Sequence, residues 1–92
     1  MRIRIRYSGP LIQFTGKRRE AIVLLDQTTV MEVIQSLSRL YGPRFRRLFF
    51  KDNQRFESSF VIMRNGEICE DYDRALANDD EIAFVAEFAG GS

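Results

Sequence analysis

The chain has 92 residues, 45% of them hydrophobic and 29% charged, which is typical of one globular domain that folds without disulfides or a metal. Its 14 Lys and Arg residues nearly balance 13 Asp and Glu residues, so the overall field does not favour binding to nucleic acid or to anionic lipid. Histidine is absent, which excludes Ser/His/Asp and Cys/His catalysis and His-ligated zinc.

The redox and targeting signals predict a cytoplasmic protein. Cys69 is the only cysteine and has no internal disulfide partner. The first six residues alternate basic and apolar side chains, unlike a secretory signal, and no apolar run approaches the roughly 20 residues of a membrane span. We therefore expect no membrane partner.

The first quarter of the chain predicts an antiparallel hairpin. Residues 2–7 alternate arginines with apolar side chains, the period of two that buries one face of a strand. The compact apolar run in residues 20–25 predicts a second strand that pairs with the first. Between them, the apolar residues 11–14 are too few for a stable helix and are expected to pack as a loop over the edge of the core.

The clearest predicted element is a helix that begins after Thr29. Thr29 and Glu32 have the spacing of a capping box, in which each side chain binds the backbone N–H of the other residue. One buried stripe is predicted from the spacing of Val30, Val33, Ile34, Leu37, Leu40 and Tyr41. Gly42 is expected to end the helix in the left-handed conformation, and Pro43 prevents its continuation.

Residues 44–60 predict a short helix followed by a polar loop. Phe49 and Phe50 either lie partly exposed at a protein interface or close the core beneath the loop. The basic residues of 17–19 and 44–47 are interpreted as a solvated face or as a docking patch for an acidic partner, in preference to an RNA site.

The last third of the chain predicts a hairpin and a final strand. Residues 60–64 are strand-like, and Asn65-Gly66 can form a type I′ turn into residues 67–70. Residues 81–88 give the final strand. The acidic residues of 71–81 lack EF-hand spacing and are interpreted as solubilising turn residues, and Cys69 as a small packing residue and not a nucleophile.

The order of these elements predicts an α+β fold of the β-grasp type, with a mixed sheet of about five strands packed against one main helix. The crossover through the helix is expected to place the strand at 60–64 parallel to a neighbour, and the last strand is expected to lie centrally beside the first. Residues 1–92 would form one such domain, with a flexible C-terminal tail at 88–92.

The tail residues Gly90 and Gly91 suit a narrow catalytic cleft. Glycine has no Cβ, so it can enter a tunnel that excludes other residues and bring a main-chain carboxyl group to another protein's active site. A carboxylate is a poor acyl donor, and adenylation by an ATP-using partner would give it a good leaving group for attack by sulfur or an amine. The alternative interpretation of the tail is a frayed end.

The whole outline resembles the MoaD/ThiS family of ubiquitin-like sulfur carriers, and in length it is closest to the small subunit of molybdopterin synthase. The positions that carry the resemblance are Thr29-Val30, Asn65-Gly66, and the block from Leu76 through Asp80-Glu81-Ile82-Ala83-Phe84 to Ala89-Gly90-Gly91.

This resemblance implies a sulfur carrier in molybdopterin (molybdenum cofactor) biosynthesis and not an enzyme, with no bound cofactor or metal. Gly91 would bear the adenylate and then the thiocarboxylate, and Gly90 would supply clearance for the tail. The implied partners are a MoeB-type adenylyltransferase that uses ATP, a sulfurtransferase, and a MoaE-type large subunit that receives the tail. Because Ser92 follows the di-glycine pair, it would first have to be removed.

Two other functions fit the same sequence. A ubiquitin-like modifier would be conjugated through Gly91 to lysines of target proteins. A non-covalent β-grasp adaptor would have an inert tail.

Overall fold

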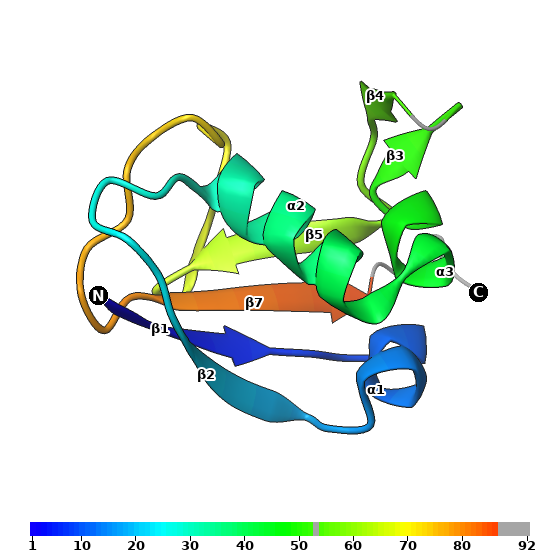
Figure 1. Ribbon diagram of the computed structural model, residues 1–92, viewed down its shortest axis with the longest axis horizontal. Helices are drawn as coiled ribbons and strands as arrows, with labels where there is room; N and C mark the ends of the chain where they lie inside the picture. The colour runs from blue at the N-terminus through cyan, green and yellow to red at the C-terminus, as the bar shows by residue number, and fades with distance from the viewer. Residues whose placement is uncertain (53, 87–92) are drawn as a thin grey trace.

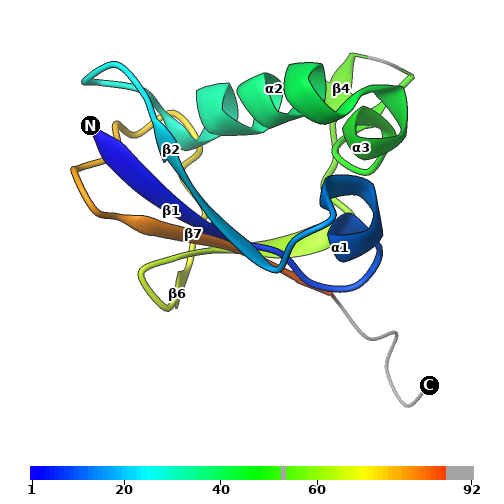
Figure 2. The ribbon, with the colours of Figure 1, turned by 60° about the horizontal axis from the view of Figure 1, so that its bottom comes forward.

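The computed structural model describes residues 1–52 and 54–86. In chain order its elements are β1 (Arg2–Arg6), α1 (Pro10–Thr15), β2 (Arg19–Val23), α2 (Val30–Tyr41), α3 (Pro43–Arg47), β3 (Phe50–Lys51), β4 (Arg55–Phe56), β5 (Phe60–Arg64), β6 (Glu67–Ile68) and β7 (Glu81–Ala86). Five strands form a mixed sheet in the order β2-β1-β7-β5-β6, and β3 pairs with β4 separately. The helices lie on one side of the sheet (Figures 1 and 2), which confirms the predicted β-grasp fold.

The final strand β7 lies in the centre of the sheet beside β1, as predicted. It runs parallel to β1, with Glu81 opposite Arg4, and antiparallel to β5, with Phe84 opposite Ile62. The prediction that β5 lies parallel to a neighbour is wrong, because both of its neighbours, β7 and β6, are antiparallel to it. The crossover through α2 does return β5 in the direction of β2, but β1 and β7 lie between those two strands.

Helix α2 begins with the predicted capping box. The Thr29 hydroxyl accepts a hydrogen bond from the Glu32 N–H at 3.2 Å, and the Glu32 carboxylate accepts one from the Thr29 N–H at 3.0 Å. The first four positions of the predicted stripe are buried, but Leu40 is 64% exposed, so its assignment to the core was wrong. The last turn of α2 packs on α3 through Tyr41, whose ring centroid lies 5.6 Å from that of Phe45, and Leu40 on the adjacent side faces solvent.

Gly42 ends α2 as predicted but not in the left-handed conformation. Its φ of 95° and ψ of −173° combine a positive φ with an extended ψ, a region open mainly to glycine. The chain therefore turns directly from α2 into α3, which begins at Pro43.

Residues 10–15 form helix α1 and not the predicted loop. Six residues are too few for a stable isolated helix, so tertiary packing must supply the stability. Leu11 is fully buried, Pro10 occupies the first turn, and Gly16 at φ 75° and ψ 13° provides a left-handed C-cap.

Residues 43–60 contain the predicted short helix, α3, but the polar loop after it is the β3–β4 hairpin. Phe49 is fully buried and Phe50 is 5% exposed, so both close the core and neither forms an exposed interface. The Phe49 ring centroid lies 5.1 Å from that of Phe84 and 5.7 Å from that of Phe60. Since Phe49 also packs on Phe45 of α3, with ring centroids 5.2 Å apart, it connects α3 to the C-terminal half of β7.

The predicted tail at 88–92, with Gly90, Gly91 and Ser92, lies outside the described residues. Within residues 1–52 and 54–86, no helix has the length and apolar character needed to cross a membrane. The same part of the chain contains no cluster of Cys, Asp and Glu side chains suited to a metal ion.

Candidate functional site

The candidate site is the C-terminal end of β7 at Ala86, the last described residue before the predicted reactive glycines. We define the exit site as Ser8, Gly9, Phe60, Phe84 and Ala86. Ala86 is the last residue of β7 and lies opposite Phe60 of β5. Figure 2 shows that β7 ends near α1, at the opposite end of the sheet from the N-terminus.

Ser8 holds the end of β7. The backbone pairing of β1 with β7 extends to Arg6 opposite Ala83, and beyond it the side chain of Ser8 replaces the missing backbone partner. Its hydroxyl accepts a hydrogen bond from the Ala86 N–H at 2.9 Å and donates one to the Phe84 carbonyl at 2.7 Å. The position of Ala86 at the end of β7 is therefore fixed by a side chain from the segment between β1 and α1.

Gly9 allows this arrangement through its backbone. Its φ of 55° and ψ of −137° belong to a region that side-chain-bearing residues rarely adopt. A Cβ atom at Gly9 would lie 3.5 Å from the Ala86 Cβ, an ordinary contact. The conformation, and not the available space, is thus the reason for glycine at this position.

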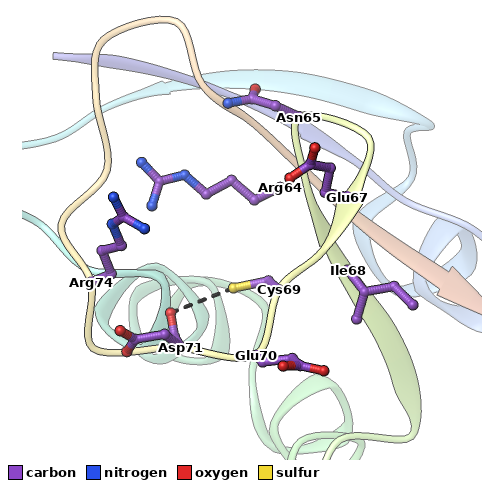
Figure 3. A pocket seen from close by; sticks show the side chains of 8 residues that line it. All are labelled: Arg64, Asn65, Glu67, Ile68, Cys69, Glu70, Asp71 and Arg74. Atoms are coloured by element: carbon purple, nitrogen blue, oxygen red, sulfur yellow. Dashed lines mark hydrogen bonds between the residues drawn. The ribbon is translucent and has the colours of Figure 1, made fainter.

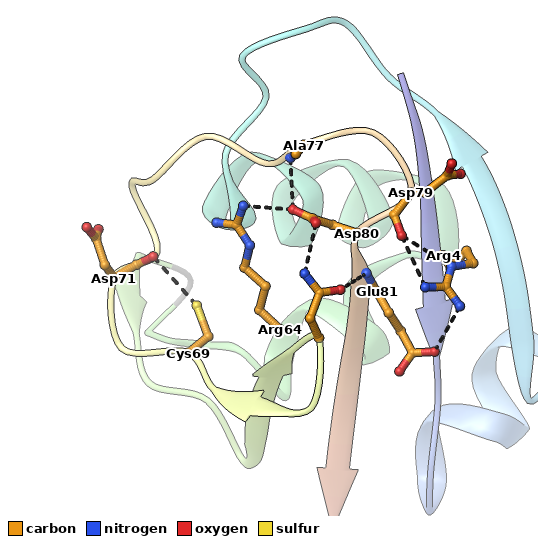
Figure 4. Close-up of polar contacts among 9 residues, drawn as sticks. Arg4, Arg64, Cys69, Asp71, Ala77, Asp79, Asp80 and Glu81 are labelled. Atoms are coloured by element: carbon orange, nitrogen blue, oxygen red, sulfur yellow. Dashed lines mark hydrogen bonds and ion pairs between the residues drawn. The ribbon is translucent and has the colours of Figure 1, made fainter.

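The start of β7 is held by Asp80, the buried carboxylate drawn in Figure 4. It accepts hydrogen bonds from the Ala77 N–H at 2.8 Å and the Asn65 side-chain amide at 2.8 Å, and it pairs with the Arg64 guanidinium at 2.7 Å. Burial alone would raise the pKa of Asp80, but these hydrogen bonds and the Arg64 charge outweigh it and lower the pKa. Asp80 is therefore a buried structural anchor, and its interpretation as a solubilising turn residue was wrong.

Asn65 connects this anchor to the predicted hairpin turn. Asn65 and Gly66 have φ values of 51° and 83°, so the turn has the predicted positive φ angles at both central residues. The Asn65 side-chain oxygen also accepts a hydrogen bond from the Glu81 N–H at 2.8 Å. Since Asn65 contacts both Asp80 and Glu81, it aligns the β5–β6 turn with the first residue of β7.

The outer face of the sheet, which the helices leave uncovered, carries an apolar patch beside the exit site. We define this outer apolar patch as Val61, Met63, Ile68, Ala83 and Val85. Val61 lies opposite Val85, and Met63 lies opposite both Ala83 and Ile68, so all five side chains share one face. Ile68 is 67% exposed and Val85 is 39% exposed. An exposed apolar surface of this kind favours a protein partner.

The other half of the outer face is basic. Arg2, Arg4 and Arg6 are the exposed residues of β1. Glu81 partly neutralises this row, with its carboxylate 3.5 Å from the Arg4 guanidinium and 3.7 Å from that of Arg6. Both arginine side chains are about half exposed to solvent, so these pairs add little stability.

A tyrosine–carboxylate cluster joins β1, β2 and α2 at the same end of the sheet as the exit site. The Glu20 carboxylate accepts hydrogen bonds from the hydroxyls of Tyr7 and Tyr41, the second at 2.5 Å, and lies 3.6 Å from the Lys17 ammonium. Burial and then the Glu20 contact raise the pKa of Tyr41 to about 12, and the same causes raise the pKa of Tyr7 further. Neither tyrosine is suited to proton transfer near neutral pH.

Cys69 is buried in the wall of a hollow of about 410 Å³ (Figure 3). Its sulfur donates to the Asp71 carbonyl at 3.6 Å. Burial raises the pKa of the Cys69 thiol despite the nearby Arg64 charge, so little thiolate forms at neutral pH. This agrees with the interpretation of Cys69 as a packing residue.

The sequence-predicted reactive residues, Gly90 and Gly91, lie outside the described part of the chain, and the structure describes the strand that leads to them. Ser8 and Asp80 were missed as anchors of that strand. The sequence shows Asp80 as an acidic residue just before an apolar strand. Its pairing with Arg64 could not be predicted from that pattern, because Arg64 lies 16 residues earlier in the chain. No local pattern could have identified Ser8, because Ala86 is 78 residues away in the chain.

Comparison with known proteins agrees with this fold. The model of the ThiS family matches residues 5–91. The solved structure of SAMP1 from Haloferax volcanii is similar with a TM-score of 0.82 and 22% identity, over 99% of this chain and 100% of that one. A putative molybdopterin converting factor subunit 1 from Pyrococcus furiosus gives a TM-score of 0.75 and 17% identity, over 96% and 99%.

A third similar structure contains two proteins. It is the complex of subunits 1 and 2 of the molybdopterin-converting factor from Helicobacter pylori, matched with a TM-score of 0.56 and 16% identity over 99% of this chain and 100% of that one. No curated protein sequence gives a significant match.

The mixed sheet, the long helix α2 packed on it and the central strand β7 define a ubiquitin-like β-grasp protein. Since the family model spans nearly all of the sequence, the chain belongs to the ThiS family of small sulfur carriers.

Proposed function

We propose that the chain carries sulfur on Gly91, as a thiocarboxylate formed after any residues that follow Gly91 have been removed. The observation that supports this most directly is the anchoring of β7 at both ends, by Asp80 at its start and by Ser8 at Ala86. These contacts hold the strand that precedes Gly91 in sequence at both of its ends. The function of the chain is then to deliver a terminal carboxyl group and not to catalyse a reaction itself.

The chemistry needs an activating partner. Attack of the Gly91 carboxylate on the α-phosphate of ATP releases pyrophosphate and gives an acyl adenylate. Sulfide (HS⁻) delivered by a sulfurtransferase then attacks the carbonyl carbon, the bond from that carbon to the AMP oxygen breaks, and AMP leaves, which gives the thiocarboxylate. We infer a MoeB-type adenylyltransferase for the first step, and ATP belongs to that partner and not to this chain.

We propose the outer apolar patch as the surface that these partners contact. It lies on β5, β6 and β7, so a protein bound there is adjacent to the strand that ends at the exit site. The same surface would serve a MoaE-type large subunit, in which sulfur passes to a pterin precursor of molybdopterin. The similarity to subunit 1 of molybdopterin converting factors supports this acceptor.

A second candidate is a ubiquitin-like modifier, conjugated through Gly91 to lysines of target proteins. It is supported by the similarity to the small archaeal modifier protein 1 of H. volcanii, with a TM-score of 0.80 and 21% identity over 95% of this chain and 98% of that one. Both candidates use the same adenylate and differ in the nucleophile that attacks it.

Mass spectrometry separates the two candidates. A chain ending at Gly91 is incubated with the activating enzyme, ATP and a sulfur donor, and the expected product shows the mass gain of one oxygen replaced by sulfur. The matched control is the chain that still ends at Ser92, which should remain unchanged. Lysine adducts in cells without any thiocarboxylate would instead establish the modifier, and function retained after deletion of residues 90–92 would leave only a non-covalent adaptor.

A further inference from the structure

The surface formed by α3 and the β3–β4 hairpin concentrates positive charge. We define the α3–β4 basic patch as Arg44, Arg46, Arg47, Lys51 and Arg55. Residues 43–57 contain these five basic residues and only two acidic ones, Asp52 and Glu57, although the whole chain has a formal net charge of +1. The positive charge is therefore a local property of this surface.

The patch surrounds a hollow of about 610 Å³, lined by Pro43, Arg46, Arg47, Phe50, Lys51 and Asp52. The Arg46 guanidinium lies 4.2 Å from the centroid of the Phe50 ring, a cation–π contact that orients it. Lys51 lies directly opposite Arg55 in the β3–β4 pair. Like charges at opposed positions destabilise a strand pair, and a bound anion would relieve this repulsion.

Three arginines of the patch, Arg44, Arg47 and Arg55, are little neutralised by carboxylates of the described residues. Among the described residues, neither Arg44 nor Arg47 has a side-chain hydrogen bond or an ion pair. Arg55 lies 3.7 Å from Glu57, but both side chains are more than half exposed, and such pairs are weak. An anionic ligand could therefore bind Arg44, Arg47 and Arg55 without displacing a strong internal ion pair.

The surroundings favour an acidic protein segment over nucleic acid. Single-stranded nucleic acid binds through exposed aromatic faces as well as cations, but Phe50 is 5% exposed and Phe56 packs against it with ring centroids 5.6 Å apart. Residues 65–81 contain seven acidic residues and one basic residue. This acidic segment lies at the other end of the molecule, which extends 38 Å along its longest axis (Figure 1), and it would repel a long polyanion.

We propose that the α3–β4 basic patch binds a short acidic segment of a partner protein. Carboxylates of that segment pair with Arg44 and Arg47 on α3 and fill the space between Lys51 and Arg55 on the hairpin. This recognition is separate from the chemistry at Gly91 and goes beyond it. It gives the chain a second contact surface, on the helical side of the sheet, away from the outer apolar patch.

The test is an NMR titration of the isotope-labelled full chain with a peptide of glutamates only, and in parallel with a uridine oligonucleotide of equal charge. We expect the peptide to shift the amide resonances of residues 43–57 and its affinity to fall about tenfold or more between low and physiological salt. Absence of shifts, shifts confined to β1 and β2, or tighter binding of the oligonucleotide through the same residues would overturn the proposal.

Charge-reversal variants complete the test. The double variant Arg44→Glu, Arg47→Glu should weaken peptide binding about tenfold or more. The control Arg18→Glu, Arg74→Glu changes the net charge equally at two exposed sites outside the patch and should bind like the wild type. The resonances of the β-sheet report whether each variant is folded, and equal loss of binding in both variants would show a nonspecific charge effect and contradict the proposal.

Discussion

The hydroxyl of Ser8 and the backbone N–H of Ala86 form a hydrogen bond of 2.9 Å between residues 78 positions apart. The same hydroxyl donates to the Phe84 carbonyl, so one side chain satisfies two backbone groups on the edge of β7 that faces β1. Neither group has a backbone partner in β1, whose pairing with β7 extends to Ala83. Ser8 thus extends the contacts along this edge of β7 from Ala83 to Ala86.

Substitution of Ser8 by alanine should loosen this end of β7 without unfolding the protein. We expect the free energy of unfolding to fall by about 1 kcal/mol and hydrogen exchange at the Ala86 amide to accelerate about tenfold. Exchange measured by NMR gives both quantities. Ser36→Ala, at a half-buried position on α2, is the control and should leave Ala86 unchanged. Equal exchange rates in the wild type and Ser8→Ala would refute the role of Ser8.

Asp80 predicts a specific response to acid. Its pKa is lowered in the folded protein from the ordinary value of 3.8, so its stabilising effect is complete above that value and is lost as the pH falls through the lowered pKa. Asp80→Asn should reduce the free energy of unfolding at pH 7 by about 1–3 kcal/mol, because Arg64 loses its buried partner. The variant should also lose less stability than the wild type on acidification.

Denaturant unfolding between neutral pH and about pH 2 measures both effects of Asp80. Asp79→Asn is the matched control, because Asp79 is next to Asp80 but exposed. Its φ is 67°, and asparagine adopts this conformation readily, so the substitution should not strain the backbone. Parallel pH profiles for Asp80→Asn and the wild type would show that the Asp80 anchor contributes no pH dependence.

The Glu20 cluster predicts a late titration of tyrosine. The pKa of Tyr41 is raised to about 12 and that of Tyr7 still higher, so the stability they add is complete below pH 10 and is lost as the pH rises through the raised values. In Glu20→Gln the pKa of Tyr41 should move down toward 10, while burial keeps part of the shift. Ultraviolet absorbance of tyrosinate records the titration. Tyr72 is the control: burial raises its pKa, but it has no contact with Glu20, so it should titrate identically in both proteins.

Charged substitutions in the outer apolar patch should weaken partner binding with little effect on the stability of the fold. Ile68→Glu and Val85→Glu each place a charge on an exposed apolar position, so the melting temperature should change by only a few degrees. With the activating enzyme we expect KM for the carrier to rise about tenfold, since a charge at the centre of an apolar interface is strongly unfavourable.

Leu25→Glu is the control for this pair, because Leu25 is 85% exposed and lies after β2, away from the patch. KM is measured from the release of pyrophosphate by the activating enzyme. The Leu25→Glu variant should have the same KM as the wild type. An unchanged KM for both patch variants would place the enzyme-binding surface elsewhere.

Much of the fold followed from local patterns. The alternation in residues 2–7 predicted β1, and the Thr29–Glu32 spacing predicted the start of α2, because both depend only on residues that are neighbours in sequence. Helix α1 was missed because its stability does not come from neighbouring residues but from the burial of Leu11 in the core. Leu40 was misassigned because its exposure depends on where α3 packs.

The sequence by itself determined the β-grasp order of elements, the Asn65-Gly66 turn and the candidate reactive glycines, since periodicity, turn conformation and tail composition are encoded locally. Only the tertiary structure decided that β5 pairs antiparallel with β7, that Asp80 pairs with Arg64, and that Ser8 holds Ala86. These contacts join segments far apart in the chain, and they exist only once β7 has entered the sheet between β1 and β5.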